Sequence, residues 1–168
     1  PHAPRIALIL PAYNEESTIG GTIEAFHLAL PNAEIVVINN NSKDRTRAVA
    51  LKTLENTGAS GRVIDEARQG KGNAVRRAFL SIDADVYVLA DADLTYPADR
   101  VQDLIDPVLT GEADMTVGDR RSEGHYAAEN KRAFHNFGNK LVEALVNRLF
   151  SANLTDIMSG YRAFSRAF

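Results

Sequence analysis

The sequence predicts an α/β fold in which a mostly parallel β-sheet has helices on both of its faces. Three short, continuous apolar runs, at residues 6–10, 35–38 and 86–90, have the pattern of strands that are buried on both sides. Segments with apolar residues at helical spacing separate these runs. Parallel neighbours need crossover connections, which helices usually provide, so the alternation favours one sheet between two layers of helices.

Two weaker strands complete the expected sheet. Residues 62–64 and 114–117 are weaker strand candidates, and each follows a turn that contains glycine. With the three stronger runs, they make a sheet of five predicted strands.

The first helix is expected between the first two strands. It ends at Pro31, and either Asn14 or Ser17 is placed to cap its start. Its apolar stripe consists of Ile19, Ile23, Phe26 and Leu30.

Four more helices alternate with the later strands. The second is expected to start after Asp44, the third after Gly72, and the fourth at Pro97, because proline suits the first helical position. The longest is expected at residues 131–150. The inward face of the third helix should carry Ala74, Val75, Ala78, Phe79 and Ile82.

Length and composition indicate one domain that spans residues 1–168. Of these 168 residues, 45% are hydrophobic and 24% are charged, as in a typical globular domain. The formal net charge of −3 argues against a nucleic-acid partner, because nucleic-acid phosphates attract basic proteins. The chain has no cysteine, which excludes disulfides, thiolate metal sites and cysteine nucleophiles.

Polar residues gather directly after the three strongest strands, at residues 12–15, 39–42 and 91–93. In open parallel sheets, ligands bind beyond the carboxyl ends of the strands. This coincidence is the main indication of function in the sequence.

Asp91 and Asp93 lie one residue apart at the end of an apolar strand. Two close carboxylates repel each other unless a positive group lies between them, and Mg²⁺ or Mn²⁺ commonly uses such carboxylates together with substrate phosphates. The alternative is that Asp93 caps a helix while Asp91 is merely solvated.

Residues 39–46 and 68–74 are the other candidate binding segments. The amides and hydroxyls of residues 39–46 could bond a nucleobase or ribose, and Lys71 with nearby backbone N–H groups could meet phosphate oxygens. The alternative for both segments is ordinary turn chemistry. Residues 68–74 match neither the Rossmann fingerprint nor the P-loop.

Further along, residues 118–131 are polar and suit a loop that closes over an anionic ligand, with Arg120 directly after a predicted strand.

Several segments, taken in order, resemble the family-2 glycosyltransferases, especially the polyprenyl-phosphate sugar transferases similar to dolichol-phosphate mannose synthase. The matching segments are residues 11–16, 39–46, 70–72, 91–97, 118–120 and 156–162. The resemblance implies a GT-A type, Rossmann-like fold. It also implies transfer of a sugar from a nucleotide-diphosphate donor, with inversion at the anomeric carbon and with Mg²⁺ or Mn²⁺ as cofactor.

The resemblance also implies which residues bind the donor. Asp91 and Asp93 would hold the metal, with Asp93 as a direct and catalytic ligand. Asn39 and Asn40 stand where the family usually has an Asp-Asp pair that contacts base and ribose, so UDP and GDP both remain open. Thr95 stands where the mannose-synthase version of the motif has Gln, which argues against mannose as the sugar. The residues implied at the donor are Pro11, Ala12, Tyr13, Glu15, Asn39, Asn40, Lys71, Asp91 and Ala92.

The expected acceptor is a polyprenyl phosphate, whose ionised oxygen is already nucleophilic near neutral pH. The residues expected to bind it are Arg120, Ser159, Gly160 and Arg162. If the acceptor is instead a glycan hydroxyl, a carboxylate base is needed, and Asp156 or Asp119 would supply it.

Two further hypotheses remain besides a glycosyltransferase. One is a catalytically silent nucleotide-sugar-binding module, and the other is a nucleotidyltransferase. The second fits residues 159–162 poorly. Because family members commonly continue past this motif, often with membrane-spanning helices, we expect a catalytic domain truncated at its C-terminus. The full-length protein would then work in the cytoplasm, at the inner face of the cell membrane.

Overall fold

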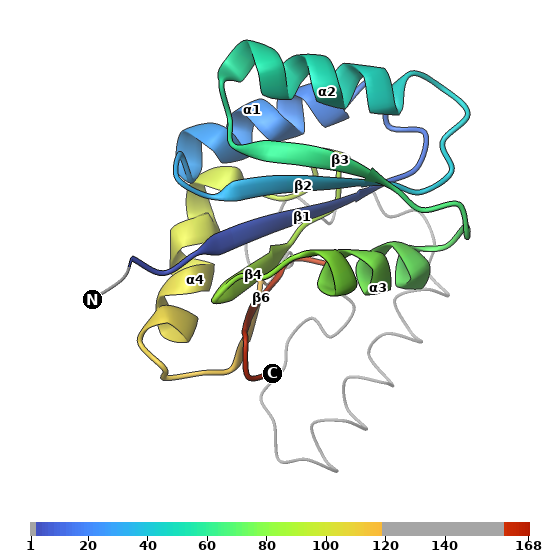
Figure 1. Ribbon diagram of the computed structural model, residues 1–168. Coiled ribbons are helices and arrows are strands. Elements are labelled where there is room, and N and C mark those ends of the chain that lie inside the picture. The colour runs from blue at the N-terminus through green and yellow to red at the C-terminus, as the bar shows by residue number, and fades with distance from the viewer. Residues whose placement is uncertain (1–2, 119–159) are drawn as a thin grey trace, which may run out of the picture.

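The structure, a computed structural model, describes residues 3–118 and 160–168. The described residues form a six-stranded sheet in the order β3-β2-β1-β4-β6-β5 (Figure 1). In chain order the elements are β1 (Ile6–Ala12), α1 (Ile19–Ala29), β2 (Glu34–Asn39), α2 (Thr46–Thr57), β3 (Gly61–Asp65), α3 (Lys71–Ser81), β4 (Val86–Leu89), the 3₁₀ helix η1 (Ala98–Arg100), α4 (Val101–Leu109), β5 (Met115–Val117) and β6 (Arg162–Ser165).

The sheet is mostly parallel, as the sequence predicts. Strands β3, β2, β1 and β4 run parallel, while β6 pairs antiparallel with both β4 and β5. The register places Ala12 opposite Asn39, and Asn39 opposite Asp65. The loops after β1, β2 and β3 therefore leave the sheet from the same edge.

The two faces of the sheet have separate cores. In β1, Leu8 and Leu10 pack with α1, α2 and α4, whereas Ala7 and Ile9 pack with α3. These four side chains are at most 1% exposed. Successive residues of a strand point to opposite faces, so a continuous apolar run supplies both cores. Figure 1 shows α1 and α2 on the side of the sheet away from α3, which confirms the prediction of helices on both faces.

One strand of the described sheet, β6, is absent from the prediction. It has four residues, Arg162–Ser165, and only Ala163 and Phe164 are apolar. These two side chains enter opposite cores. Two apolar residues give too short a pattern to indicate a strand, whereas the five predicted strands all appear near their expected positions.

The starts of three helices differ from the prediction. Thr18, not Asn14 or Ser17, precedes α1, because the backbone N–H groups of Thr18 and Ile19 both donate to Glu15 O and form a turn first. Arg45, not Asp44, directly precedes α2. Helix α3 begins at Lys71, before Gly72 rather than after it.

The fourth helix and one core position also need correction. Pro97 does not begin α4, since a turn of 3₁₀ helix, η1, comes between them. Phe79 was expected to face inward but is 41% exposed. Its ring nevertheless contacts Tyr87 and Phe164, with ring centroids 5.2 Å and 6.0 Å away, so Phe79 covers the margin of the core.

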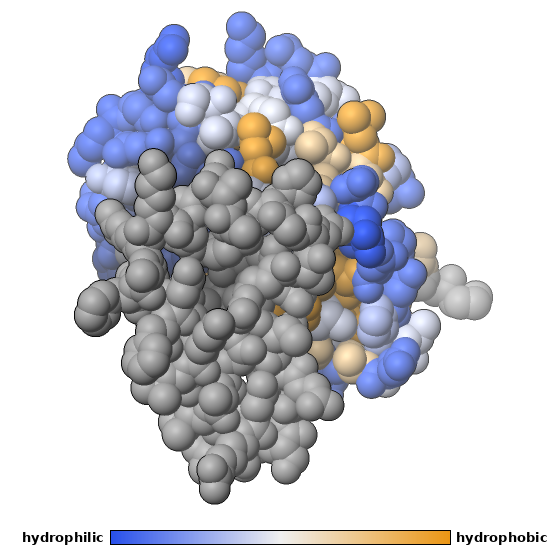
Figure 2. Space-filling view, turned by 180° about the vertical axis from the view of Figure 1, so that it is seen from behind, coloured by the Kyte–Doolittle hydropathy of each residue, from blue (hydrophilic) through white to orange (hydrophobic). Residues whose placement is uncertain are grey.

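The described surface is mixed in character. Figure 2 shows a mainly hydrophilic face with separate hydrophobic patches. Leu28, Leu80 and Phe168 are the most exposed of the large apolar side chains, at 82%, 71% and 70%. Within the described ranges, no helix has the length and hydrophobicity needed to span a bilayer.

Candidate active site

Hydrogen bonds join the loop after β1 to the loop after β2. Asn14 N donates to Ser42 Oγ at 3.1 Å, and Lys43 N donates back to Asn14 Oδ1 at 2.8 Å. Glu15 N donates to Thr46 Oγ1 at 2.7 Å. Asn14 adopts a left-handed φ of 55°, a conformation that asparagine tolerates better than most residues. The two loops therefore hold their polar groups together at the carboxyl edge of the sheet.

Asp44 forms a second link between these loops. Its Oδ1 accepts hydrogen bonds from the backbone N and the side-chain Oγ1 of Thr46, and its Oδ2 accepts one from Glu16 N. Burial alone would raise the pKa of Asp44, but these hydrogen bonds to the charged form outweigh it and hold the pKa below its usual value. Asp44 therefore stays ionised and braces the start of α2.

Asn39 ends β2 and is 8% exposed. Its Nδ2 donates to Asp65 Oδ1 at 2.8 Å, and Asp65 Oδ2 accepts a hydrogen bond from Arg47 Nε at 3.1 Å. Asn39 Oδ1 is buried and has no hydrogen-bond partner among the described residues. Such an unsatisfied buried acceptor is rare in native proteins.

Asn40 holds the loop between β3 and α3. Its Nδ2 donates to the backbone oxygens of Glu66 and Arg68, at 3.2 Å and 2.8 Å, and its Oδ1 accepts from Gly70 N at 2.8 Å. Gly70 precedes Lys71 and has a φ of 122°, a conformation that favours glycine. Asn40 thus fixes the backbone from which Lys71 projects.

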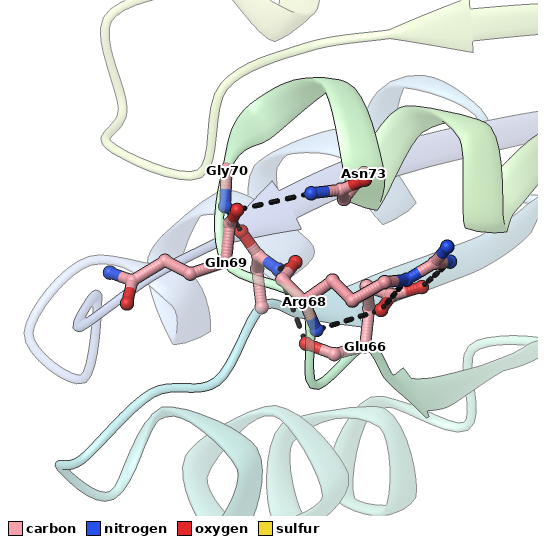
Figure 3. Close-up of polar contacts among 6 residues, drawn as sticks. Glu66, Arg68, Gln69, Gly70 and Asn73 are labelled. Carbon is pink, nitrogen blue, oxygen red and sulfur yellow. Dashed lines mark hydrogen bonds and ion pairs between the residues drawn. The ribbon is translucent and has the colours of Figure 1, made fainter.

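Glu66 and Arg68 strengthen the same loop (Figure 3). Glu66 is 6% exposed and accepts hydrogen bonds from the backbone N, Nε and Nη2 of Arg68, at 2.8–2.9 Å. The hydrogen bonds from Arg68 to its charged form lower the pKa of Glu66 to about 2. The loop therefore carries a stable ion pair beside the candidate phosphate-binding segment.

Asp91 lies where three distant segments meet. Lys71 Nζ forms an ion pair with Asp91 Oδ1, and Tyr96 OH donates to Asp91 Oδ2 at 3.3 Å. Gly160 N donates to Tyr96 OH at 2.7 Å. The Tyr161 ring stacks on Tyr96, with centroids 4.9 Å apart. The structure thus brings together Lys71, Asp91 and Gly160, which the sequence places in the candidate site, and excludes the alternative of a merely solvated Asp91.

Asp93 is exposed and lies in the loop after β4. Its Oδ1 accepts a hydrogen bond from Thr95 N at 3.0 Å, across Leu94 with its left-handed φ of 62°. This bond closes a turn within the loop. The alternative of a helix cap is wrong, because the following helix begins only at Ala98.

The carboxylates of Asp91 and Asp93 suit a metal ion whose remaining ligands come from the substrate. No group of three or more His, Cys, Asp or Glu residues that could hold a metal occurs in the described part of the chain. Mg²⁺ and Mn²⁺ need no such cage, since one or two carboxylates together with substrate phosphates suffice. Asp91 and Asp93 provide the hard oxygen ligands these ions prefer, so the residues present fit a divalent cation.

Similarity to known proteins decides the family. Residues 7–168 match the sequence model of Glycosyl transferase family 2. This chain belongs to glycosyltransferase family 2. It is 41% identical over 123 residues to Protein RfbJ of Shigella flexneri, covering 73% of this chain and 91% of RfbJ. It is 32% identical over 161 residues to a dolichyl-phosphate hexose transferase of Haloferax volcanii, covering 96% of this chain and 66% of that protein.

A solved structure shares the fold of this glycosyltransferase domain. Glucosyl-3-phosphoglycerate synthase of Mycobacterium tuberculosis, in complex with Mn²⁺, UDP-glucose and glycerol 3-phosphate, matches with a TM-score of 0.75 and 26% identity. The match covers 98% of this chain and 58% of the synthase chain. The expected GT-A type of α/β fold is confirmed. The chain spans less than two thirds of the synthase and of the hexose transferase.

The remaining expected residues of this glycosyltransferase lie in different places. Pro11 and Ala12 end β1, and Ala92 follows β4, where its backbone oxygen accepts from Thr22 Oγ1 at 3.1 Å. Arg162 begins β6. Outside the described residues lie the predicted helix at residues 131–150, Arg120, Asp156 and Ser159.

Sequence reasoning missed Asp65, Glu66 and Tyr96. Asp65 and Glu66 directly follow the apolar core of a predicted strand, so the rule that singled out the other strand ends would have found them. Tyr96 gave no such signal, because its role depends on Gly160, which is 64 residues away along the chain.

Proposed function

We propose that this domain transfers a sugar, with inversion, from a nucleoside-diphosphate donor to a polyprenyl phosphate. The observation that carries the proposal is the meeting of Lys71, Asp91 and Gly160 beside Asp93, at the carboxyl edge of a GT-A sheet. A cation and two carboxylates at that edge suit a metal-bound diphosphate.

The donor would lie across the ends of β1, β2 and β4. Tyr13 is 44% exposed and is available to pack on a nucleoside. We assign donor binding to Pro11, Ala12, Tyr13, Glu15, Asn39, Lys71, Asp91 and Ala92. Asn40 would act indirectly, by holding the loop that carries Lys71.

Charge on the leaving diphosphate has to be stabilised as the sugar–phosphate bond breaks. Mg²⁺ or Mn²⁺ held by Asp91 and Asp93 supplies such charge stabilisation when bound. Lys71 is 52% exposed and already neutralises Asp91. When a donor is present, its ammonium group would be shared with phosphate oxygens.

The acceptor side is proposed from residues 159–162 and Arg120. A dolichyl-phosphate hexose transferase is among the relatives, which supports a lipid phosphate as the nucleophile. Gly160 lies next to Asp91, and Arg162 is the first residue of β6. A phosphate bound by these two residues would therefore lie near the donor. Arg120 and Ser159 would assist. Asp156 would serve as base only for a hydroxyl acceptor. The setting we propose is the inner face of the cell membrane.

Calorimetric titration with UDP, GDP and their sugar conjugates, with and without Mn²⁺, tests the donor site. We expect one nucleotide to bind in a Mn²⁺-dependent manner, and Asp93→Asn to weaken that binding roughly 10- to 100-fold. Asp103→Asn is the control: it changes an exposed aspartate that lies on α4, away from the loop that carries Asp93, and should leave nucleotide binding unchanged. Equal binding to Asp93→Asn and wild type would contradict the metal role.

Turnover of the identified sugar donor with a polyprenyl phosphate tests the acceptor. Product formation with the lipid phosphate but not with a free glycan would support the proposal. Transfer to the glycan alone would replace it with the hydroxyl alternative and bring in Asp156. Donor binding without any transfer would favour a silent binding module.

A further inference from the structure

Two neighbouring residues, Thr95 and Tyr96, each hold one oxygen of an aspartate in the candidate metal site. Thr95 N donates to Asp93 Oδ1 at 3.0 Å, and Tyr96 OH donates to Asp91 Oδ2 at 3.3 Å. We infer that Tyr96 is a positioning residue that commits Asp91 Oδ2 to the protein, so that Asp91 Oδ1 and Asp93 Oδ2 are the oxygens presented to a divalent cation. This inference rests on the proposed function and deepens it.

The direction of the Tyr96 hydroxyl follows from its two neighbours. A phenol has one proton to donate and an oxygen that can also accept. Gly160 N donates to Tyr96 OH at 2.7 Å, so the oxygen is the acceptor on that side. Asp91, which is ion-paired with Lys71, offers only acceptors, and the phenol proton is therefore directed to its Oδ2.

The Tyr96 ring is itself held in place by packing. It is 5% exposed and stacks on the Tyr161 ring, with centroids 4.9 Å apart and planes 24° apart. Tyr161 OH donates to the backbone oxygen of Pro97, the residue after Tyr96, at 3.2 Å. A hydroxyl on a ring packed in this way has a fixed position, as a residue that orients a metal ligand requires.

The two oxygens of Asp91 have different surroundings. Gly160 packs so closely against Oδ2 that a Cβ on this glycine would come within 2.8 Å of that oxygen. Oδ1 is ion-paired with Lys71 Nζ, the end of a side chain that is 52% exposed. An ammonium group on a flexible stem can move to another anion, such as a diphosphate, whereas the ring and backbone beside Oδ2 stay where they are. Oδ1 is therefore the oxygen that a substrate can release for a cation.

Asp93 is arranged in the same way. Its Oδ1 closes the turn with Thr95 N, and no described residue forms a hydrogen bond or ion pair with its Oδ2. Mg²⁺ is commonly bound through one or two carboxylates together with substrate phosphates and water. One available oxygen on each of the two aspartates meets that requirement.

The test is the enhancement of nucleotide affinity by Mn²⁺, measured by calorimetric titration of UDP and GDP with and without the metal. Tyr96→Phe removes the hydroxyl but keeps the ring and its stack on Tyr161. We expect the enhancement to fall roughly tenfold, because loss of a group that orients a metal ligand has an effect of this size. The affinity measured without Mn²⁺ should stay at the wild-type level.

Tyr87→Phe is the matched control. Tyr87 is also buried, and its hydroxyl likewise accepts from a backbone N, that of Ala84, and donates to Ile82 O, but in the core under α3. This variant should keep the wild-type enhancement. Urea unfolding checks that both variants are folded.

The possible outcomes separate this inference from the proposed function. If Tyr96 only stabilises the fold, Tyr96→Phe would weaken binding by the same factor with and without Mn²⁺, which would overturn the inference and leave the donor site intact. An enhancement that Tyr96→Phe retains in full would do the same. A wild-type protein that binds a nucleotide without any enhancement by Mn²⁺ would overturn both the inference and the proposed metal, and binding of no nucleotide would also defeat the donor proposal.

Discussion

Gly160 lies where a larger residue would collide with the centre of the site. A Cβ at this position would come within 2.8 Å of Asp91 Oδ2, 2.9 Å of Lys71 Nζ and 3.0 Å of Tyr96 OH. These are the atoms that hold Asp91 in place, so a methyl group there has to push one of them aside. The glycine is therefore required by the close approach of the segment before β6 to the loop after β4 and to Lys71 of α3.

Gly160→Ala should weaken donor binding by roughly tenfold, because it displaces Lys71 or Asp91 from their ion pair. The unfolding free energy should fall by only about 1 kcal/mol, since the displaced groups are partly exposed. Calorimetric donor titration and urea unfolding would measure the two effects.

Gly21→Ala serves as the control for this glycine. Its Cβ would meet only the Leu94 methyl groups, at an ordinary 3.6 Å, and alanine in a helix interior is favoured by roughly 0.5–1 kcal/mol. Donor affinity should therefore stay at the wild-type level in Gly21→Ala. If Gly160→Ala also kept wild-type affinity, the crowding around Asp91 would have no functional consequence.

At the scale of elements, ionised Glu66 helps to hold the loop between β3 and α3 through its hydrogen bonds with Arg68. Its folded pKa of about 2 lies below the ordinary value of 4.5, with the hydrogen bond from Arg68 as the largest cause. A lowered carboxyl pKa stabilises the folded state at any pH above the ordinary value. That contribution is lost as the pH falls from about 4.5 toward 2.

Glu66→Gln should therefore be less stable than the wild type at neutral pH, and the difference should shrink as the pH falls below 4.5. Urea unfolding of both proteins across this range would measure it. Glu112→Gln, at an exposed glutamate, should follow the wild-type curve. A difference between Glu66→Gln and the wild type that stayed constant with pH would show that the charge of Glu66 contributes nothing.

A helix or strand can be predicted from the sequence when the residues that cause it to form lie within that element. The strands β1, β2 and β4 could be predicted because both of their faces are buried, so every residue carries the signal. β6 could not, because it becomes a strand only by pairing between β4 and β5. The helix starts were misplaced by a few residues, since turns such as the one at Glu15 compete with the expected caps.

The residues of the candidate site likewise fall into those that a local sequence pattern predicts and those that depend on distant contacts. Asp91 and Lys71 could be predicted from strand ends and a glycine-rich segment, whose signals lie within a few neighbouring residues. The contacts of Gly160 with Asp91, and of Asn39 with Asp65, depend on strand order and register. Neither contact is encoded in a local pattern, which is why Tyr96 emerged only from the structure; the strand-end rule could have found Asp65, but not its contact with Asn39.

At the scale of the whole molecule, the sheet separates two cores that share no side chains. Ile35 and Ile38 lie in the same strand, β2, yet Ile35 packs in the core under α1, α2 and α4 and Ile38 in the core under α3. Both are at most 1% exposed. Leu8 and Ile35, in contrast, are direct partners across β1 and β2 and share one core.

This separation predicts which pairs of substitutions are additive. Ile35→Val and Ile38→Val should each lower the unfolding free energy by about 0.5–1.5 kcal/mol. Together they should add to within about 0.5 kcal/mol, because they have no partner in common. Leu8→Ala combined with Ile35→Val should depart from additivity by about 0.5 kcal/mol or more, since both enlarge the same packed region. Urea unfolding of the single and double variants measures both cycles. Strong coupling between Ile35 and Ile38 would mean that the sheet transmits packing changes from one face to the other.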